Sequence, residues 1–152
     1  MTKRDEFRKK PMETVVDTSI FVGVVFEEND AIEALKQCKG ILILPEKVLK
    51  EASDRLHDRG IHGGVVLRPL TLPGKMWQGW RKGLKPKIEL GFPVPKELSE
   101  VDREVLETAL SLSGKGRITC VLHKDPRHFG LVKESMRAKN VFVLDSIEYL
   151  DP

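Results

Sequence analysis

The chain has 152 residues, of which 40% are hydrophobic and 32% charged, enough for one domain with its own core and a net charge of +3. No apolar run approaches the roughly 18 residues that a bilayer crossing needs, and the charged N-terminus "MTKRDEFRKKP" has no apolar segment behind it, so neither a membrane protein nor a signal peptide is expected. Cys38 and Cys120 stand far apart and form neither a disulfide framework nor a zinc pattern, which favours a reducing, cytoplasmic setting.

The first sixty residues alternate short apolar runs with amphipathic segments. Strands are predicted at two runs rich in Val, Ile and Leu, residues 14–17 and 40–45. Helices are predicted at residues 30–38, with Asp30 as the N-cap, and at residues 46–60. The run "SIFVGVVF", which follows the first strand, fits either a strand or a helix.

Residues 60–98 differ from the rest of the chain in composition and charge. They are dense in Gly and Pro and show no sustained period, so we expect an irregular excursion with one short helix around residues 76–82. They hold seven Lys or Arg and two acids, a net charge of +5, which leaves −2 for the remainder. The basic excess of the protein therefore lies in one segment.

That basic segment is a candidate nucleic-acid-binding strip, with its centre at "KMWQGWRKGLKPK". Lys and Arg neutralise phosphates, and Trp77 or Trp80 could stack on unpaired bases. The alternative is a solvated loop that two tryptophans anchor to the core, because tryptophan is usually at least partly buried. The basic side chains are the first candidates for contact with nucleic-acid phosphates: Arg81, Lys82 and Lys85.

The C-terminal third returns to regular elements. They are predicted as a helix at 99–112, a strand at 117–122, a helix at 126–140, a strand at 141–145 and a short turn or helix at 146–150. Buried strands that alternate with amphipathic helices are typical of an α/β fold. We therefore expect residues 1–152 to form a single three-layer α/β/α domain around a mainly parallel sheet of four to five strands. In such sheets, ligands bind beyond the carboxyl ends of the strands.

Four acidic residues occupy notable places, and each has an ordinary structural explanation. Asp17 ends the first strand and Asp125 follows the third, where both are also good helix N-caps. Asp102 lies three residues after Ser99, as in a capping box. Glu51 has a basic residue four positions to either side, as on many helix surfaces.

The joint arrangement of these acids suggests more than four separate caps and surface pairs. Two lie at carboxyl ends of strands, and the helical pair, Glu51 and Asp102, lie beside apolar core positions rather than opposite them. Four converging carboxylates would repel one another unless a cation neutralised them. Hard oxygen ligands suit Mg²⁺ or Mn²⁺, so the sequence indicates a candidate metal site.

Four segments, "VVDTS", "LPEKVLKEA", "LSEVDREVLETAL" and "ITCVLHKDPRHF", together resemble the PIN domain, a family of metal-dependent ribonucleases that includes toxins and RNA-processing enzymes. The resemblance covers almost the whole chain. It implies an endoribonuclease that hydrolyses RNA phosphodiester bonds with one or two Mg²⁺ or Mn²⁺ ions. The implied catalytic and metal-binding quartet is Asp17, Glu51, Asp102 and Asp125.

The resemblance also implies supporting groups and partners. Ser19 matches the hydroxyl that accompanies the first aspartate, whereas His123 stands where the family usually has Thr or Ser. Glu104 and Glu107 share a helix with Asp102 and are auxiliary candidates. The implied partners are single-stranded RNA, a second copy of the chain, and a cognate antitoxin or an RNA-processing partner.

Two other kinds of function stay open. One is a PIN-like module that binds RNA without cutting it, which the complete quartet disfavours. The other is a different α/β metal phosphohydrolase. A haloacid-dehalogenase-type enzyme would need a second Asp two residues after the first, where this chain has Ser19, and a receiver-type domain would need paired acids that are missing.

Overall fold

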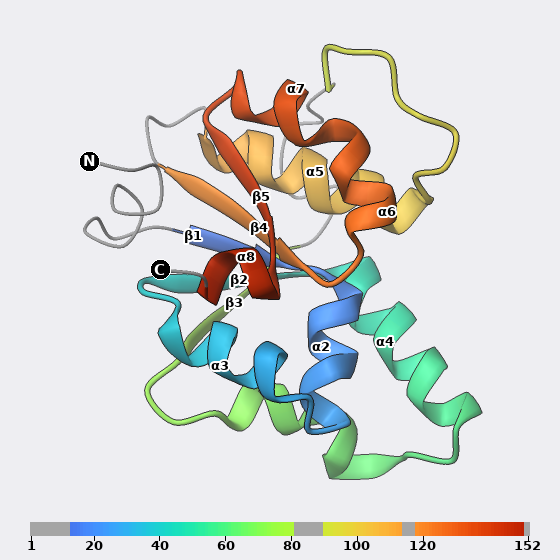
Figure 1. The fold of residues 1–152 in the computed structure, drawn as a ribbon. Coiled ribbons are helices and arrows are strands. Elements are labelled where there is room, and N and C mark those ends of the chain that lie inside the picture. The colour runs from blue at the N-terminus through green and yellow to red at the C-terminus, as the bar shows by residue number, and fades with distance from the viewer. Residues whose placement is uncertain (1–12, 81–89, 114–117, 151–152) are drawn as a thin grey trace.

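The computed structural model describes residues 13–80, 90–113 and 118–150, and they are built around one five-stranded sheet (Figure 1). All neighbouring strands pair in parallel, in the order β3-β2-β1-β4-β5. The strands are β1 (Glu13–Val16), β2 (Ile41–Pro45), β3 (Met76–Trp80), β4 (Thr119–His123) and β5 (Val141–Asp145). The predicted α/β fold with a parallel central sheet is confirmed.

Helices cover both faces of this sheet and complete the three layers. In Figure 1, α5 and α7 lie above the sheet, and α3 and α8 lie below it. The helices are α2 (Thr18–Val25), α3 (Asn29–Gln37), α4 (Glu46–Asp58), α5 (Glu100–Ser113), α6 (Pro126–Phe129), α7 (Lys133–Arg137) and α8 (Ser146–Leu150). Two 3₁₀ segments, η1 (Gly63–Thr71) and η2 (Gly130–Val132), complete the described elements. No helix among them is both long and apolar enough for a bilayer crossing.

Alternation along β1 assigns its side chains to two separate cores. Val15 is fully buried in the cluster that contains residues of α4, α5 and α7. Val16 is equally buried but belongs to the cluster that contains residues of α2, α3 and α8. Strands that are buried on both faces are apolar at most positions, which explains the Val, Ile and Leu runs of the sequence; β1 keeps two buried polar residues, Glu13 and Thr14, at its start.

The order of the strands creates a switch point between β1 and β4. From β1 the chain builds outward to β2 and β3 on one side, and then to β4 and β5 on the other. At such a point the connections leave neighbouring strands in opposite directions, which opens a crevice beyond the carboxyl ends. The backbone N–H of Asp17 donates to the carbonyl of Leu122 at 3.0 Å, so these two strand ends are held together at that crevice.

The prediction of a short helix around residues 76–82 is wrong, because residues 76–80 form the edge strand β3. Trp77 pairs with Leu42 and packs against both core clusters, with its ring at 6.5 Å from that of Phe21 in an edge-to-face arrangement. Met76 points the other way and is 67% exposed. The excursion therefore contributes a strand to the sheet, and the core-anchoring interpretation of Trp77 is confirmed.

Three further expectations need correction or completion. The ambiguous run after β1 is a helix, α2, because Asp17 caps its first turn. Asp30 is not an N-cap, since α3 begins at Asn29. The helix predicted at 126–140 is divided into α6, η2 and α7, and the break begins at Gly130, a residue type with low helix propensity.

We predict that Trp77→Ala lowers the free energy of unfolding by about 2 kcal/mol, which is less than the roughly 3–5 kcal/mol for truncation of a fully buried aromatic ring, because Trp77 is only half-buried. Met76→Ala, one residue earlier on the exposed face of the same strand, should change it by less than about 0.5 kcal/mol. Urea denaturation followed by circular dichroism measures both. Equal losses for the two variants would contradict the packing of β3 described above.

Candidate functional site

Three of the four predicted acids gather beyond the carboxyl ends of β1 and β4. Asp17 connects β1 to α2, Asp125 connects β4 to α6, and Asp102 lies in the first turn of α5. The α/β topology brings them together from positions 85 and 23 residues apart in the chain. Three carboxylates are therefore placed at the switch point of the sheet.

Each of these acids also caps a helix, as the simpler interpretation of the sequence predicted. The Asp17 carboxylate accepts from the backbone N–H of Ser19 at 3.1 Å, and that of Asp125 accepts from His128 at 3.4 Å. Asp102 and Ser99 form the reciprocal capping box, with distances of 3.0 and 3.1 Å. Capping and convergence are compatible, because the N-termini of these helices lie where the strands end.

Ser19 ties Asp17 to the β4 end of the crevice. Its hydroxyl donates to Asp17 Oδ2 at 2.6 Å and accepts from the backbone N–H of Lys124 at 2.8 Å. The Asp17 side chain is thereby fixed in orientation from both strands. This is the supporting role that the sequence indicated for Ser19.

Burial makes the Asp17 carboxylate costly to ionise. Only 4% of the residue is exposed, and this desolvation raises the pKa of Asp17 from 3.8 to about 6. The hydrogen bonds from Ser19 lower that pKa, and the negative charge of Asp102 raises it. The influence of Asp102 is electrostatic support for the closeness of the two carboxylates.

His128 is the residue of this site that sequence reasoning missed. Its Nδ1 lies 2.9 Å from Asp125 Oδ2 and 4.0 Å from Asp102 Oδ2, so the imidazole stands between the two carboxylates. The available signal was its spacing, since a residue three positions after a helix N-cap returns toward that cap. His123, which is one residue closer to Asp125 in the sequence, was the histidine predicted to lie near the site.

His123 is buried and contacts the backbone of Asp125. Its Nδ1 accepts from the backbone N–H of Asp125 at 2.9 Å, and its ring stacks on Phe129 at 4.7 Å. Burial lowers the pKa of His123 to about 4, so the ring is neutral near pH 7, as an accepting Nδ1 requires. The neutral ring of His123 thus fixes the backbone of Asp125 through this hydrogen bond.

Glu51 is the acid for which no contact with the other three is found. It is half-buried on α4, and its carboxylate pairs with Arg55 at 3.3 Å. The buried Glu104 of α5 instead accepts from the backbone N–H of Lys47 at 3.3 Å, which links α5 to the start of α4. The Lys47 side chain pairs with Glu100 rather than with Glu51.

The donor set suits a hard divalent ion by its chemistry, because carboxylate oxygens are the ligands that Mg²⁺ and Mn²⁺ prefer. Within residues 13–80, 90–113 and 118–150, however, no three His, Cys, Asp or Glu side chains lie close enough to hold an ion. Asp17, Asp102 and Asp125 therefore lie at the same end of the sheet, but their side chains do not surround a common point.

The basic RNA-binding candidates Arg81, Lys82 and Lys85 lie outside the described residues.

The chain matches no protein-family model, no curated protein and no solved structure. The fold and the arrangement of the acids are therefore the basis for any functional conclusion.

We predict that Asp17→Asn stabilises the metal-free protein at pH 8 and has little effect at pH 3. The pKa of Asp17 is higher in the folded state, so the folded state binds the proton more tightly and stability falls as pH rises from about 4 to about 6. Above pH 6 the full difference, about 3 kcal/mol, separates wild type from the variant, whose amide still caps α2.

Urea denaturation in EDTA at both pH values tests this prediction. Asp54→Asn on the exposed surface of α4 is the matched control and should show no comparable pH-dependent gain. A loss of stability in Asp17→Asn at pH 8 would mean that Asp17 serves the fold mainly as a charged cap.

Proposed function

We propose that this protein is a PIN-type, divalent-metal-dependent endoribonuclease. The single observation that carries the proposal is the gathering of Asp17, Asp102 and Asp125 at the switch point between β1 and β4. Switch points are where open parallel sheets bind their ligands, and buried like charges are a common mark of functional sites.

The role of each acid in metal binding would depend on how rigidly the fold holds it. Asp17 and Asp125 follow directly on strand ends and would be the inner metal ligands. Asp102 would complete the cage from α5, with Glu51 approaching from α4. Mg²⁺ or Mn²⁺, when bound, would polarise the scissile phosphate and activate water for its hydrolysis. Ser19 and His123 would orient the two inner carboxylates through the hydrogen bonds described above.

The capping hydrogen bonds alone do not account for this arrangement. A cap is satisfied by Asn or Ser as well as by Asp, and neither of these would create charge repulsion. Here Asp17 is an ionisable group in a buried position, next to a second carboxylate that raises its pKa further. A charge that destabilises the free protein points to a cationic ligand.

The finer parts of the proposal rest on the resemblance. They are a single-stranded RNA substrate, a homodimer, a cytoplasmic location, and an antitoxin or RNA-processing partner. A protein that cuts RNA in a cell needs such control over when it acts, which is consistent with either kind of partner.

We predict metal-dependent cleavage of labelled single-stranded RNA by the wild-type protein. Asp17→Asn and Asp125→Asn should each lower the rate by about 100-fold or more, since each removes a carboxylate that would hold the ion that stabilises charge on the reacting phosphate. Gel analysis of time courses with Mg²⁺, Mn²⁺ or EDTA measures this. Glu33→Gln, an exposed acid on α3, is the control and should cleave normally.

The outcomes separate the competing functions. Cleavage that survives both substitutions would refute the carboxylate site. RNA binding without metal-dependent cleavage would indicate the non-catalytic binding module, and hydrolysis of small phosphate esters without RNA cleavage would indicate another phosphohydrolase.

Metal binding can be tested without activity. At a hundredfold excess over its dissociation constant, Mg²⁺ or Mn²⁺ should stabilise the wild-type protein by about 2.7 kcal/mol. The same ion should stabilise Asp17→Asn and Asp125→Asn much less, as measured by thermal denaturation. An equal stabilisation of wild type and both variants would place the ion elsewhere.

A further inference from the structure

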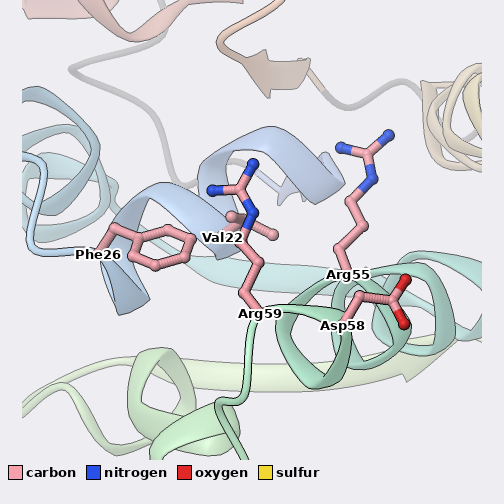
Figure 2. A pocket seen from close by; sticks show the side chains of 5 residues that line it. All are labelled: Val22, Phe26, Arg55, Asp58 and Arg59. Carbon is pink, nitrogen blue, oxygen red and sulfur yellow. The ribbon is translucent and has the colours of Figure 1, made fainter.

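A pocket of about 340 Å³ lies between the ends of α2 and α4. It is lined by Val22, Phe26, Arg55, Asp58 and Arg59. Figure 2 shows Arg59 reaching from the end of α4 toward Phe26 and Val22, with the guanidinium of Arg55 raised on the same side of α4. The volume is in the range of small-ligand sites.

Two arginines of this pocket, Arg55 and Arg59, lie one helical turn apart. They are four residues apart at the end of α4, a spacing at which like charges repel on a helix. Arg55 pairs with Glu51 at 3.3 Å, but no carboxylate partner of Arg59 is found among the described residues. In Figure 2 the Asp58 carboxylate points away from both guanidinium groups. An anion between Arg55 and Arg59 would relieve the repulsion.

Phe26 adds an aromatic surface to these charges. The residue is 37% exposed, and the Arg59 guanidinium lies over its ring at 5.2 Å. A favourable helix dipole would explain cations at the end of α4, but it would not explain an exposed aromatic ring beside them. A stacked guanidinium and phenyl ring offers a flat surface on which a nucleic-acid base can lie.

The pocket is linked to the carboxylate crevice by two helices. Asp17 caps the start of α2 and Phe26 follows its end, which separates them by about 13 Å along the helix axis. On α4, Arg55 lies one turn beyond Glu51 and is paired with it. A strand with its scissile phosphate at the acids would reach the pocket within a few nucleotides.

We propose that this pocket binds one nucleotide of the RNA strand beside the cleavage position, with its phosphate on Arg55 and Arg59 and its base on the layer formed by Arg59 and Phe26. The inference rests on the proposed ribonuclease function and gives it a described substrate contact. In this proposal the pocket determines the affinity for RNA and does not take part in the chemical step.

Binding of a short fluorescein-labelled oligouridylate in EDTA, followed by fluorescence anisotropy, tests the pocket without any cleavage. Arg59→Met should weaken binding about tenfold and lower the slope of log affinity against log salt by about 0.7, because one phosphate contact is lost. Phe26→Ala should weaken binding about tenfold with an unchanged salt slope. On an abasic oligomer of equal length, Phe26→Ala should have no effect, whereas Arg59→Met should still lower the salt slope by about 0.7 because its phosphate contact remains.

Lys50→Met is the matched control, since Lys50 is an exposed cation on the same helix and faces the side opposite to Arg59. It should leave affinity and salt slope unchanged. Circular dichroism of each variant excludes loss of folding as the cause. Wild-type affinity in both Arg59→Met and Phe26→Ala, or equal losses in Lys50→Met, would overturn the proposal, as would a wild-type protein that does not bind the oligomer.

The failure of the pocket and the failure of the ribonuclease proposal give different results. Metal-dependent cleavage with unchanged binding by Arg59→Met would refute the pocket and leave the enzyme. Weakened binding by Arg59→Met in a protein that never cleaves would support the pocket in an RNA-binding module. Where both hold, Arg59→Met should raise KM about tenfold and leave kcat near that of wild type.

Discussion

The parallel pairing of β1 with β4 is the constraint on which the site depends. Asp17 N–H bonds to the Leu122 carbonyl at 3.0 Å and Lys124 N–H bonds to the Ser19 hydroxyl at 2.8 Å, so the two strand ends are joined by backbone and side chain together. These contacts lie at the one place where the direction of sheet growth reverses. Everything that faces the crevice, including the start of α2 and of α6, is positioned from this pair of strand ends.

The carboxylates that cap helices in this protein are the same carboxylates that form the candidate site. A carboxylate at the start of a helix satisfies backbone N–H groups and interacts favourably with the helix dipole. Three such starts, those of α2, α5 and α6, lie at the same end of the sheet. Asp102 raises the pKa of Asp17, and His128 contacts both Asp102 and Asp125. The Nδ1 atom of His128 lies 2.9 Å from Asp125 and 4.0 Å from Asp102, so this side chain stands between two of the acids. The hydrogen bonds that begin these three helices therefore also position the acids of the candidate site.

The sequence predicted well what depends on local pattern. The strands β1, β2, β4 and β5, the capping box of Ser99 and Asp102, and the caps at Asp17 and Asp125 all follow from residue types at fixed spacing. It failed where tertiary contacts decide. Residues 76–80 form a strand because Trp77 finds a place between two cores beside β2, and Asp30 is drawn from a capping role to accept from the Ser146 hydroxyl. The position of His128 between two acids required the topology of the whole sheet.

A site assembled from helix caps inherits the dynamics of helix ends. The first turns of helices open locally far more often than the strands of a buried sheet. When the first turn of α5 frays, the contact between Ser99 and Asp102 is lost and the Asp102 carboxylate leaves the crevice, while β1 and β4 stay paired. The crevice would thus alternate between assembled and disassembled forms inside an intact fold, and any ligand that gathers the acids would slow hydrogen exchange at those helix starts.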